Sequence, residues 1–234
     1  MRSIRVKDSS NWMGSFTNTA LSRRGAFPAL LAVMWVLAAP SVTAAEPLRI
    51  VALGDSLTAG YGLAENQAFP VKLEAALKAK GHDVDVINAG VSGDTASGGL
   101  ARLDWSVPDK TDAVILELGA NDALRAVDPV VTRKSLDEAI QKLKSRKIEI
   151  LLAGMQAPRN LGEDYAARFD PIFPELAKKH DVLLYPFFLD GVATLTKLNL
   201  PDGVHPTAAG IDIIVARILP KVEELIARVR ANRK

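Results

Sequence analysis

The sequence contains a serine, a histidine and an aspartate whose types and spacing suit them to acyl transfer. Ser56 lies between two glycines in residues 54–60, and His205 follows Asp202 by three positions in residues 202–206. A serine hydroxyl becomes a good nucleophile only when a nearby base takes its proton. A histidine can be that base, and a carboxylate beside it fixes the tautomer and stabilises the charged ring. These residues predict chemistry that passes through a serine ester.

The other two histidines suit this role less well. His82 and His180 each precede a predicted strand, at the amino edge of the sheet, where we expect solvated loop residues. His205 alone has an aspartate three positions before it and Pro206 directly after it, and proline suits the first turn of a helix. We therefore assign the base to His205. On its own, Ser56 would be better explained as a plain helix cap, and only the other motifs favour catalysis.

The elements that must position these residues alternate along the chain. Five short aliphatic runs, bounded by glycine, proline, aspartate or asparagine, are typical of buried strands in a parallel sheet. Between them lie segments with apolar residues at helical spacing. The alternation predicts a three-layer α/β/α sandwich with a mostly parallel five-stranded sheet. The predicted strands are residues 48–53, 84–87, 113–118, 148–152 and 182–185, and the predicted helices are 68–80, 130–147, 168–180 and 211–229, with Pro220 as a candidate break in the last.

In such sheets ligands bind at the carboxyl ends of the strands, so the segments that follow strands are where a site is expected. Four segments placed in this way carry reactive or polar residues. They are residues 54–60 with Ser56, residues 88–95 with Gly93, residues 119–122 with Asn121, and residues 202–206 with His205. Together they supply a hydroxyl, an imidazole, a carboxylate, a carboxamide and flexible backbone, which are the groups that acyl transfer needs.

These four segments, in this order and at this spacing, resemble the motif blocks of the SGNH, or GDSL, hydrolases. The resemblance extends from about residue 48 to about residue 226. Within the family it is closest to the bacterial periplasmic thioesterase, lysophospholipase and arylesterase group. Three phrases carry that likeness: Gly-Asp-Ser-Leu at 54–57, Ser-Gly-Asp-Thr at 92–95 and Asp-Gly-Val-His-Pro at 202–206. The family implies a flavodoxin-like sandwich without a metal or organic cofactor.

The resemblance also implies roles for individual residues. Ser56 would be the nucleophile, His205 the base, and Asp202 the group that orients the base. The oxyanion hole would be formed by the N–H groups of Ser56 and Gly93 and by the side chain of Asn121. Taken alone, Asn121 could be only a turn residue, and Gly93 only a left-handed backbone position. Their catalytic roles therefore rest on the resemblance.

The acyl pocket is expected beside these groups. The resemblance implies that the segments after the third and fourth strands border the acyl chain, with Leu124, Met155, Ala157 and Pro158 as substrate-binding residues. Ala157 is small and is expected to widen a shallow groove. The alternative is that Met155 and Leu124 only complete the core.

We expect the function to be hydrolysis of small-molecule or lipid esters, including aryl esters, acyl thioesters and lysophospholipids. One alternative keeps the serine mechanism but acts on acetylated carbohydrate or peptidoglycan. Such a site would need several aromatic platforms, and only 6% of the residues are aromatic. A second alternative is a flavodoxin-like module that binds phosphate, which Asp55 in the first loop opposes. Asp94 and Asp122 are expected to brace turns rather than bind a metal.

The first 45 residues are expected to be a secretory signal, so that residues 46–234 form one hydrolase domain in the periplasm or outside the cell. Basic residues precede an apolar run at 25–39, and small residues follow at 42–45. A retained membrane anchor is the alternative, but the run is shorter than the roughly 20 residues that a spanning helix needs. Sec or twin-arginine export, initiation at Met13 and the cleavage position stay open.

Charge and cysteine content argue against other classes. The whole chain has a net charge of +2, but residues 1–44 hold five basic residues and one acidic residue, so their removal leaves about −2. That leaves no basic face for nucleic acid. The chain has no cysteine, which excludes disulfides and thiolate zinc sites. We therefore expect no metal, no cofactor, no nucleic acid partner and no stable membrane insertion after cleavage; the oligomeric state stays open.

Overall fold

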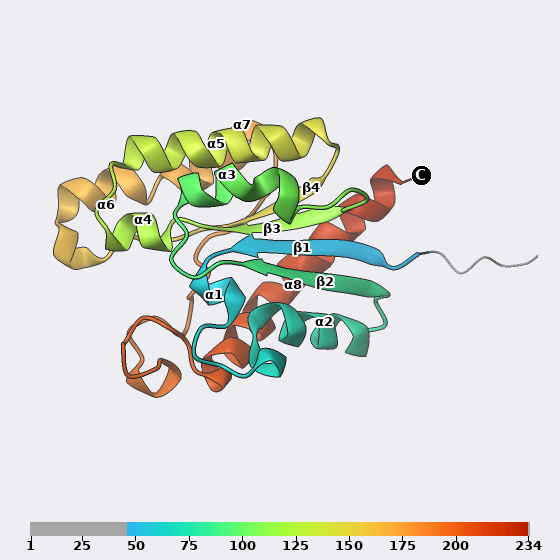
Figure 1. The fold of residues 1–234 in the computed structure, drawn as a ribbon, viewed down its shortest axis with the longest axis horizontal. Helices are drawn as coiled ribbons and strands as arrows, with labels where there is room; N and C mark the ends of the chain where they lie inside the picture. Colours follow the sequence, from blue (N-terminus) through green and yellow to red (C-terminus); the bar gives the residue numbers. More distant parts are fainter. Residues whose placement is uncertain (1–45, 234) are drawn as a thin grey trace, which may run out of the picture. The chain divides into compact units, whose positions relative to one another are not determined.

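A computed structural model of the chain describes residues 46–233, and the predicted signal, residues 1–45, lies outside them. The described residues form a five-stranded sheet with helices on both faces (Figure 1). Its strands lie in the order β2-β1-β3-β4-β5, and every neighbouring pair is parallel. They are β1 (Leu48–Gly54), β2 (Val84–Gly90), β3 (Ala113–Glu117), β4 (Glu149–Ala153) and β5 (Leu183–Tyr185). The predicted sandwich is confirmed, and its strand order is flavodoxin-like.

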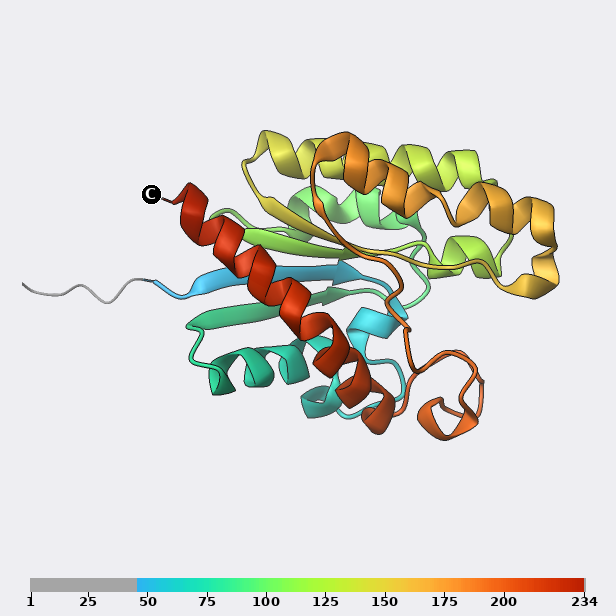
Figure 2. The ribbon, with the colours of Figure 1, turned by 180° about the vertical axis from the view of Figure 1, so that it is seen from behind.

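The helices divide between the two faces of the sheet. Two of them, α2 (Phe69–Ala79) and α8 (Ala208–Asn232), lie on one face, and α8 crosses the sheet diagonally (Figure 2). On the other face lie α3 (Ala96–Ser106), α5 (Pro129–Ser145) and α7 (Ile172–His180) (Figure 1). The short helices are α1 (Ser56–Ala59), α4 (Ala120–Leu124) and α6 (Glu163–Phe169), with 3-10 turns η1 (Glu65–Gln67), η2 (Arg159–Leu161) and η3 (Thr196–Leu198).

The burial of the strands follows from this layering. Every residue of β3 is buried, and β1 is buried except for Arg49, because helices cover both faces of these inner strands. The edge strand β2 is buried only at alternate positions near its start. It also continues to Gly90, three residues beyond the prediction, because its backbone goes on pairing with β1 after its side chains become polar or small.

Helix α3 was not predicted, because its first turn contains two glycines that disfavour helix. Thr95 caps the helix by accepting a hydrogen bond from the N–H of Gly98 at 3.2 Å. Gly99 lets the helix approach the sheet, since a Cβ there would lie 2.2 Å from Leu118 Cδ1. Close packing against Leu118, the residue that follows β3, therefore outweighs the weak local propensity.

Two other helices differ from prediction at prolines. The segment predicted as one helix at 168–180 is divided between α6 and α7, because Pro171 has no N–H to continue the helical hydrogen bonds. Pro220, by contrast, does not interrupt α8. It is exposed, as is Ala216, so the carbonyl that loses its partner can be hydrated. Helix α8 begins at Ala208 with Thr207 as its cap, so Pro206 is not in its first turn as predicted.

Within residues 46–233, no helix combines the length and the apolar composition that crossing a membrane requires.

Gly90 allows β2 to end in contact with α1, and its replacement should lower the free energy of unfolding. A Cβ at this position would lie 2.3 Å from Ala59 N and 2.8 Å from the carbonyl oxygen of Asp55, which are backbone atoms. Gly90→Ala should therefore destabilise the fold by about 1–3 kcal/mol, measured by urea unfolding. Asp85→Ala, an exposed position of the same strand, is the matched control and should change stability by less than about 0.5 kcal/mol. Equal midpoints for the two variants would contradict this close approach.

Candidate active site

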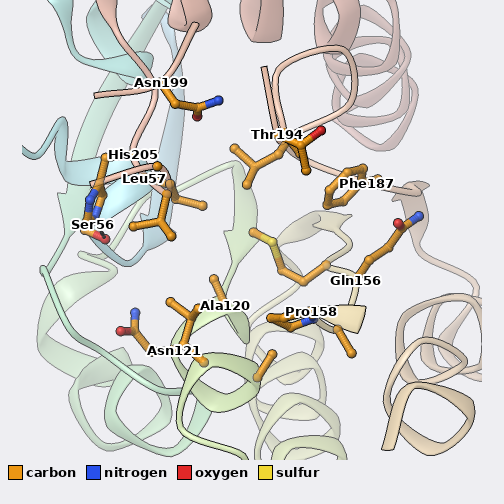
Figure 3. A pocket seen from close by; sticks show the side chains of 18 of the residues that line it. Ser56, Leu57, Ala120, Asn121, Gln156, Pro158, Phe187, Thr194, Asn199 and His205 are labelled. Atoms are coloured by element: carbon orange, nitrogen blue, oxygen red, sulfur yellow. Dashed lines mark hydrogen bonds between the residues drawn. The ribbon is translucent and has the colours of Figure 1, made fainter. Parts of the chain in front are cut away.

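Ser56, His205 and Asp202 form a continuous chain of hydrogen bonds. Ser56 Oγ lies 2.8 Å from His205 Nε2, and His205 Nδ1 lies 2.7 Å from Asp202 Oδ2. Figure 3 shows the serine and the imidazole side by side at one end of a pocket. The fold thus brings together two side chains that are 149 positions apart in the sequence.

Ser56 is held by a tight turn between β1 and α1. Asp55 caps the helix, because its Oδ1 accepts the N–H of Leu57 at 3.0 Å. Gly54 permits the turn, since a Cβ there would lie 2.1 Å from Thr58 Oγ1. Ser56 is therefore the first residue of α1, and although only 8% exposed it lines the pocket.

His205 is held by a loop that closes on itself. The N–H of Leu200 donates to the carbonyl of His205 at 2.7 Å, and the N–H of Thr207 donates to the carbonyl of Leu198 at 2.8 Å. Between these pairs, Asp202 Oδ1 accepts two backbone N–H groups, each at 3.0 Å. The carboxylate therefore fixes both the loop and the imidazole.

Backbone hydrogen bonds also set the charge of Asp202. The N–H groups of His205 and Val204, followed by the imidazole itself, lower the pKa of the Asp202 carboxyl to about 2. Asp202 is consequently an anion at any pH at which the protein is expected to work. An anion hydrogen-bonded to Nδ1 leaves Nε2 to face Ser56, as a general base requires.

Tyr61 is a neighbour of the histidine that the sequence analysis missed. Its ring centroid lies 4.4 Å from that of His205, with the ring planes tilted by 35°. It limits the orientations open to the imidazole. The only signal in the sequence was its position directly after Gly60, at the end of the first motif.

The two other predicted oxyanion residues lie in different surroundings. Asn121 lines the same pocket as Ser56, and its Nδ2 donates to Asp55 Oδ2 at 3.1 Å. Gly93 lies in the adjacent turn, with φ of +87°, and is not part of the pocket lining. Its carbonyl accepts a hydrogen bond from the Arg125 guanidinium at 2.8 Å.

A buried arginine that the sequence analysis missed joins two of the four segments around the site, residues 54–60 and residues 88–95. The Arg102 guanidinium donates to the Asp94 carboxylate at 2.5 Å, to the carbonyl of Ala89 at 2.9 Å and to the carbonyl of Gly54 at 2.8 Å. It thereby ties the ends of β1 and β2 to the turn that contains Gly93. Because α3 was not predicted, nothing in the sequence pattern directed this side chain inward.

Asp94 and Asp122 both accept hydrogen bonds within the protein, Asp94 from a side chain and Asp122 from the backbone and a side chain. Asp94 binds Arg102, and Asp122 accepts the N–H of Ala96 at 2.8 Å and the hydroxyl of Thr132 at 2.9 Å. Among residues 46–233 no group of three or more histidine, cysteine, aspartate or glutamate side chains is arranged to hold a metal ion.

The expectation that His82 and His180 are solvated is wrong. Their side chains are only 16% and 11% exposed. His82 Nε2 lies 3.1 Å from Glu223 Oε1, and His180 Nε2 is hydrogen-bonded to Asp137 Oδ1. Each imidazole packs beside a carboxylate from a neighbouring helix, at the edge of the sheet opposite the candidate site.

Two buried carboxyl groups lie beneath Ser56. Glu117 is fully buried; its Oε2 accepts the Thr58 hydroxyl at 2.6 Å and the N–H of Asp55 at 3.4 Å, whereas Oε1 has no partner. Burial raises the pKa of Glu117 well above its usual range, and the neighbouring Asp55 carboxyl raises it further. Burial also raises the pKa of Asp55 to about 6.

A pocket of about 550 Å³ opens beside the serine. All four predicted substrate-binding residues line it, namely Leu124, Met155, Ala157 and Pro158. Leu124 is 54% exposed and Met155 only 3%, so Met155 also belongs to the core. The wall that the sequence analysis missed follows β5 and comprises Phe187, Leu189, Ala193, Thr194, Asn199, Gly203 and Val204. Figure 3 shows Phe187 and Gln156 at the end of the pocket far from Ser56.

A serine, a histidine and an aspartate joined by hydrogen bonds at the carboxyl edge of a parallel sheet define the arrangement of a serine hydrolase. Comparison with known proteins identifies the particular family. Residues 52–213 match the GDSL-like Lipase/Acylhydrolase family. The chain therefore belongs to this family, and the predicted class of enzyme, a carboxylic ester hydrolase, is confirmed.

Individual relatives agree with this assignment. The chain is 40% identical over 159 residues to an arylesterase from Vibrio mimicus, a match that covers 68% of this chain and 80% of the relative. It is 36% identical over 184 residues to thioesterase 1/protease 1/lysophospholipase L1 of Escherichia coli K12, covering 78% and 86% of the two chains. The crystal structure of AlinE4, an SGNH-hydrolase family esterase, is similar with a TM-score of 0.66 and 46% identity, covering 78% of this chain and 98% of AlinE4.

The buried acid Glu117 should make stability depend on pH. Because its pKa is higher in the folded chain than the value of about 4.3 in an unfolded chain, folding loses stability as pH rises between the two values. Glu117→Gln keeps an oxygen acceptor but cannot ionise, so its melting temperature should exceed that of the wild type at pH 8. Each pH unit by which the pKa is raised corresponds to about 1.4 kcal/mol, or roughly 3–5 °C in a chain of this size.

The advantage of Glu117→Gln should shrink as the pH is lowered toward about 4, where the free carboxyl is itself protonated. The exposed Glu138→Gln on α5 is the matched control and should show no such dependence. A Glu117→Gln protein that melts below the wild type at pH 8 would mean that an ionised Glu117 stabilises the fold.

Proposed function

We propose that this protein hydrolyses carboxylic esters and thioesters through a covalent acyl-enzyme on Ser56, with His205 as general base and Asp202 as its orienting anion. The observation that carries the proposal is the unbroken hydrogen-bond chain from Asp202 to Ser56, which ends at the mouth of an apolar pocket. Ser56 Oγ attacks the ester carbonyl while His205 Nε2 takes its proton.

The remaining steps follow from the same groups. The tetrahedral intermediate collapses as the charged imidazole returns its proton to the departing alcohol or thiol, which leaves the acyl group on Ser56. Water then attacks this ester, with His205 again as the base, and the carboxylic acid and the free hydroxyl are released. The positive imidazole that forms in each step lies beside the Asp202 anion, which stabilises it.

The oxyanion is proposed to bind the N–H groups of Ser56 and Gly93 and the amide of Asn121. Asn121 lines the pocket with Ser56, which supports its part in this assignment. The carbonyl of Gly93 is held by Arg125 and its neighbour Asp94 by Arg102, so the turn that carries the Gly93 N–H is fixed before substrate binds. Donors fixed in advance are what make such a site effective.

The substrates are proposed to be aryl esters, acyl thioesters and lysophospholipids of short to medium acyl length. The pocket wall is largely apolar and is formed by Leu57, Leu124, Met155, Ala157, Pro158, Phe187 and Leu189, which suits an acyl chain. The names of the relatives, an arylesterase and a thioesterase with lysophospholipase activity, agree with this range. Phe187 is the single aromatic among the described lining residues, so the pocket offers little stacking surface for a sugar.

The place of action is proposed to be the periplasm or the exterior of the cell, with residues 1–45 as the export signal and residues 46–234 as the hydrolase domain. The basic start, the apolar run and the small residues of this segment support the proposal.

The nucleophile is tested by covalent labelling. Ser56→Ala should abolish reaction with a fluorophosphonate probe and lower hydrolysis of a p-nitrophenyl ester to background, while the melting temperature stays within a few degrees. Ser145→Ala, an exposed serine at the end of α5, is the control and should label fully. A Ser56→Ala protein that still labels at another serine would refute the proposed mechanism.

The proposed acyl pocket is tested by enlarging one residue of its lining. Ala157 is nearly buried in the lining of the pocket, so Ala157→Leu should shorten the preferred acyl chain without affecting Ser56 or His205. A methylene in an apolar pocket contributes about 1–3 kcal/mol, so kcat/KM for the longer esters should fall by roughly ten-fold or more per excluded methylene. The measurement is kcat/KM for p-nitrophenyl esters from C2 to C12, with the exposed Ala216→Leu on α8 as control. A profile identical to the wild type would place the acyl chain elsewhere.

A further inference from the structure

The Asp55 carboxylate connects the turn of the serine with the predicted oxyanion residue Asn121. Asp55 is completely buried, and its two oxygens serve different partners. Oδ1 accepts the N–H of Leu57, which caps α1, and Oδ2 accepts Nδ2 of Asn121 at 3.1 Å. Capping of α1 uses only Oδ1, so the hydrogen bond from Asn121 to Oδ2 must have a different role.

A carboxamide has two N–H groups on one nitrogen and an oxygen on the other side. The opposite orientation of the Asn121 amide would bring its oxygen against Asp55 Oδ2, where two acceptors repel. The hydrogen bond therefore fixes which way the amide lies. It occupies one of the two N–H groups and leaves the second for the pocket that Asn121 lines with Ser56.

This orientation is strongest when Asp55 is ionised, and the hydrogen-bond partners of the two buried carboxyl groups favour the charge on Asp55 over the charge on Glu117. Glu117 lies next to Asp55, and two carboxyl groups buried together without a cation bind one proton between them. Both oxygens of Asp55 accept N–H donors, whereas Glu117 Oε1 has no partner and both of its donors bind Oε2. The geometry therefore assigns the proton to Glu117 and the negative charge to Asp55.

We propose that Asp55 is a positioning residue for ester hydrolysis, which acts by holding one N–H of Asn121 so that the other is directed at the oxyanion. The inference rests on the proposed function, since it needs Asn121 as an oxyanion donor. Asp55 itself touches no reacting atom. Its effect on the reaction passes through Asn121, and this separates it from a residue that only stabilises the fold.

The test is a double-mutant cycle of kcat on a p-nitrophenyl ester, with Asp55→Asn, Asn121→Ala and the combination. Asparagine still caps a helix, but its NH₂ group then faces that of Asn121 and turns the amide away. Loss of one oxyanion donor costs about 10²–10³ in kcat. We expect Asp55→Asn to lower kcat by about 10–100-fold with little change in KM, and by less than about threefold when Asn121 is already alanine.

Asp55→Ser provides a second arm, since serine also caps a helix but is too short to reach Asn121, and it should give the same non-additive pattern. Asp128→Asn is the matched control, because Asp128 caps α5 through the N–H of Val130 but has no contact with the site. Losses that multiply in the double variant, or a single Asp55→Asn loss below threefold, would overturn the proposal. The fluorophosphonate labelling of Ser56→Ala tests the proposed mechanism without involving Asp55 or Asn121. Failure of the proposed function can therefore be distinguished from failure of this inference.

Discussion

The hydrogen bond between His205 and Ser56 is the constraint on which the arrangement of this site depends. It joins segments from the two ends of the domain, and neither end is free to move. Ser56 is fixed by the turn between β1 and α1, where Gly54 leaves room for the side chains of Thr58 and Glu117 and Gly90 leaves room for the backbone of Asp55 and Ala59. His205 is fixed by a loop that pairs with itself and is braced by Asp202. The flavodoxin-like order brings both ends to one edge of the sheet.

The sequence was most informative where local chemistry and periodicity agree. The five strands, the meeting of the segments around Ser56 and His205, and the pocket residues that follow the third and fourth strands were predictable, because each aliphatic run ends in a segment that begins at the same edge of the sheet. Helix α3 and the inward position of Arg102 were not predictable. Gly98 and Gly99 disfavour a helix locally, and α3 forms because it packs against Leu118. The partners of His82 and His180 come from distant helices, α8 and α5, and no local pattern records them.

The site combines one ionised carboxylate, Asp202, with two neighbouring buried carboxyl groups, Asp55 and Glu117. Asp202 is ionised because backbone N–H groups surround it near the surface. Asp55 and Glu117 are buried without a contacting cation among the described residues, and burial of such groups opposes their ionisation. This buried pair lowers the stability of the fold near Ser56, and in return it supplies a helix cap, hydrogen bonds that hold the turn, and a hydrogen bond to the amide of Asn121.

The self-paired loop around His205 also separates, along the chain, the residues that hold the imidazole from residues that line the pocket. Its backbone pairing begins at Leu198, after the stretch from Phe187 to Thr194 that forms one wall of the pocket, and Asn199 joins the two by donating to the carbonyl of Val192 at 2.8 Å. Exchanges at its lining residues can remodel the wall while the paired loop keeps the imidazole in place, whereas Phe188 and Val192 in the same stretch are fully buried in the core and leave less room for change. A directed library confined to Phe187, Leu189, Ala193 and Thr194 would therefore vary the pocket wall without changing the loop that holds the imidazole.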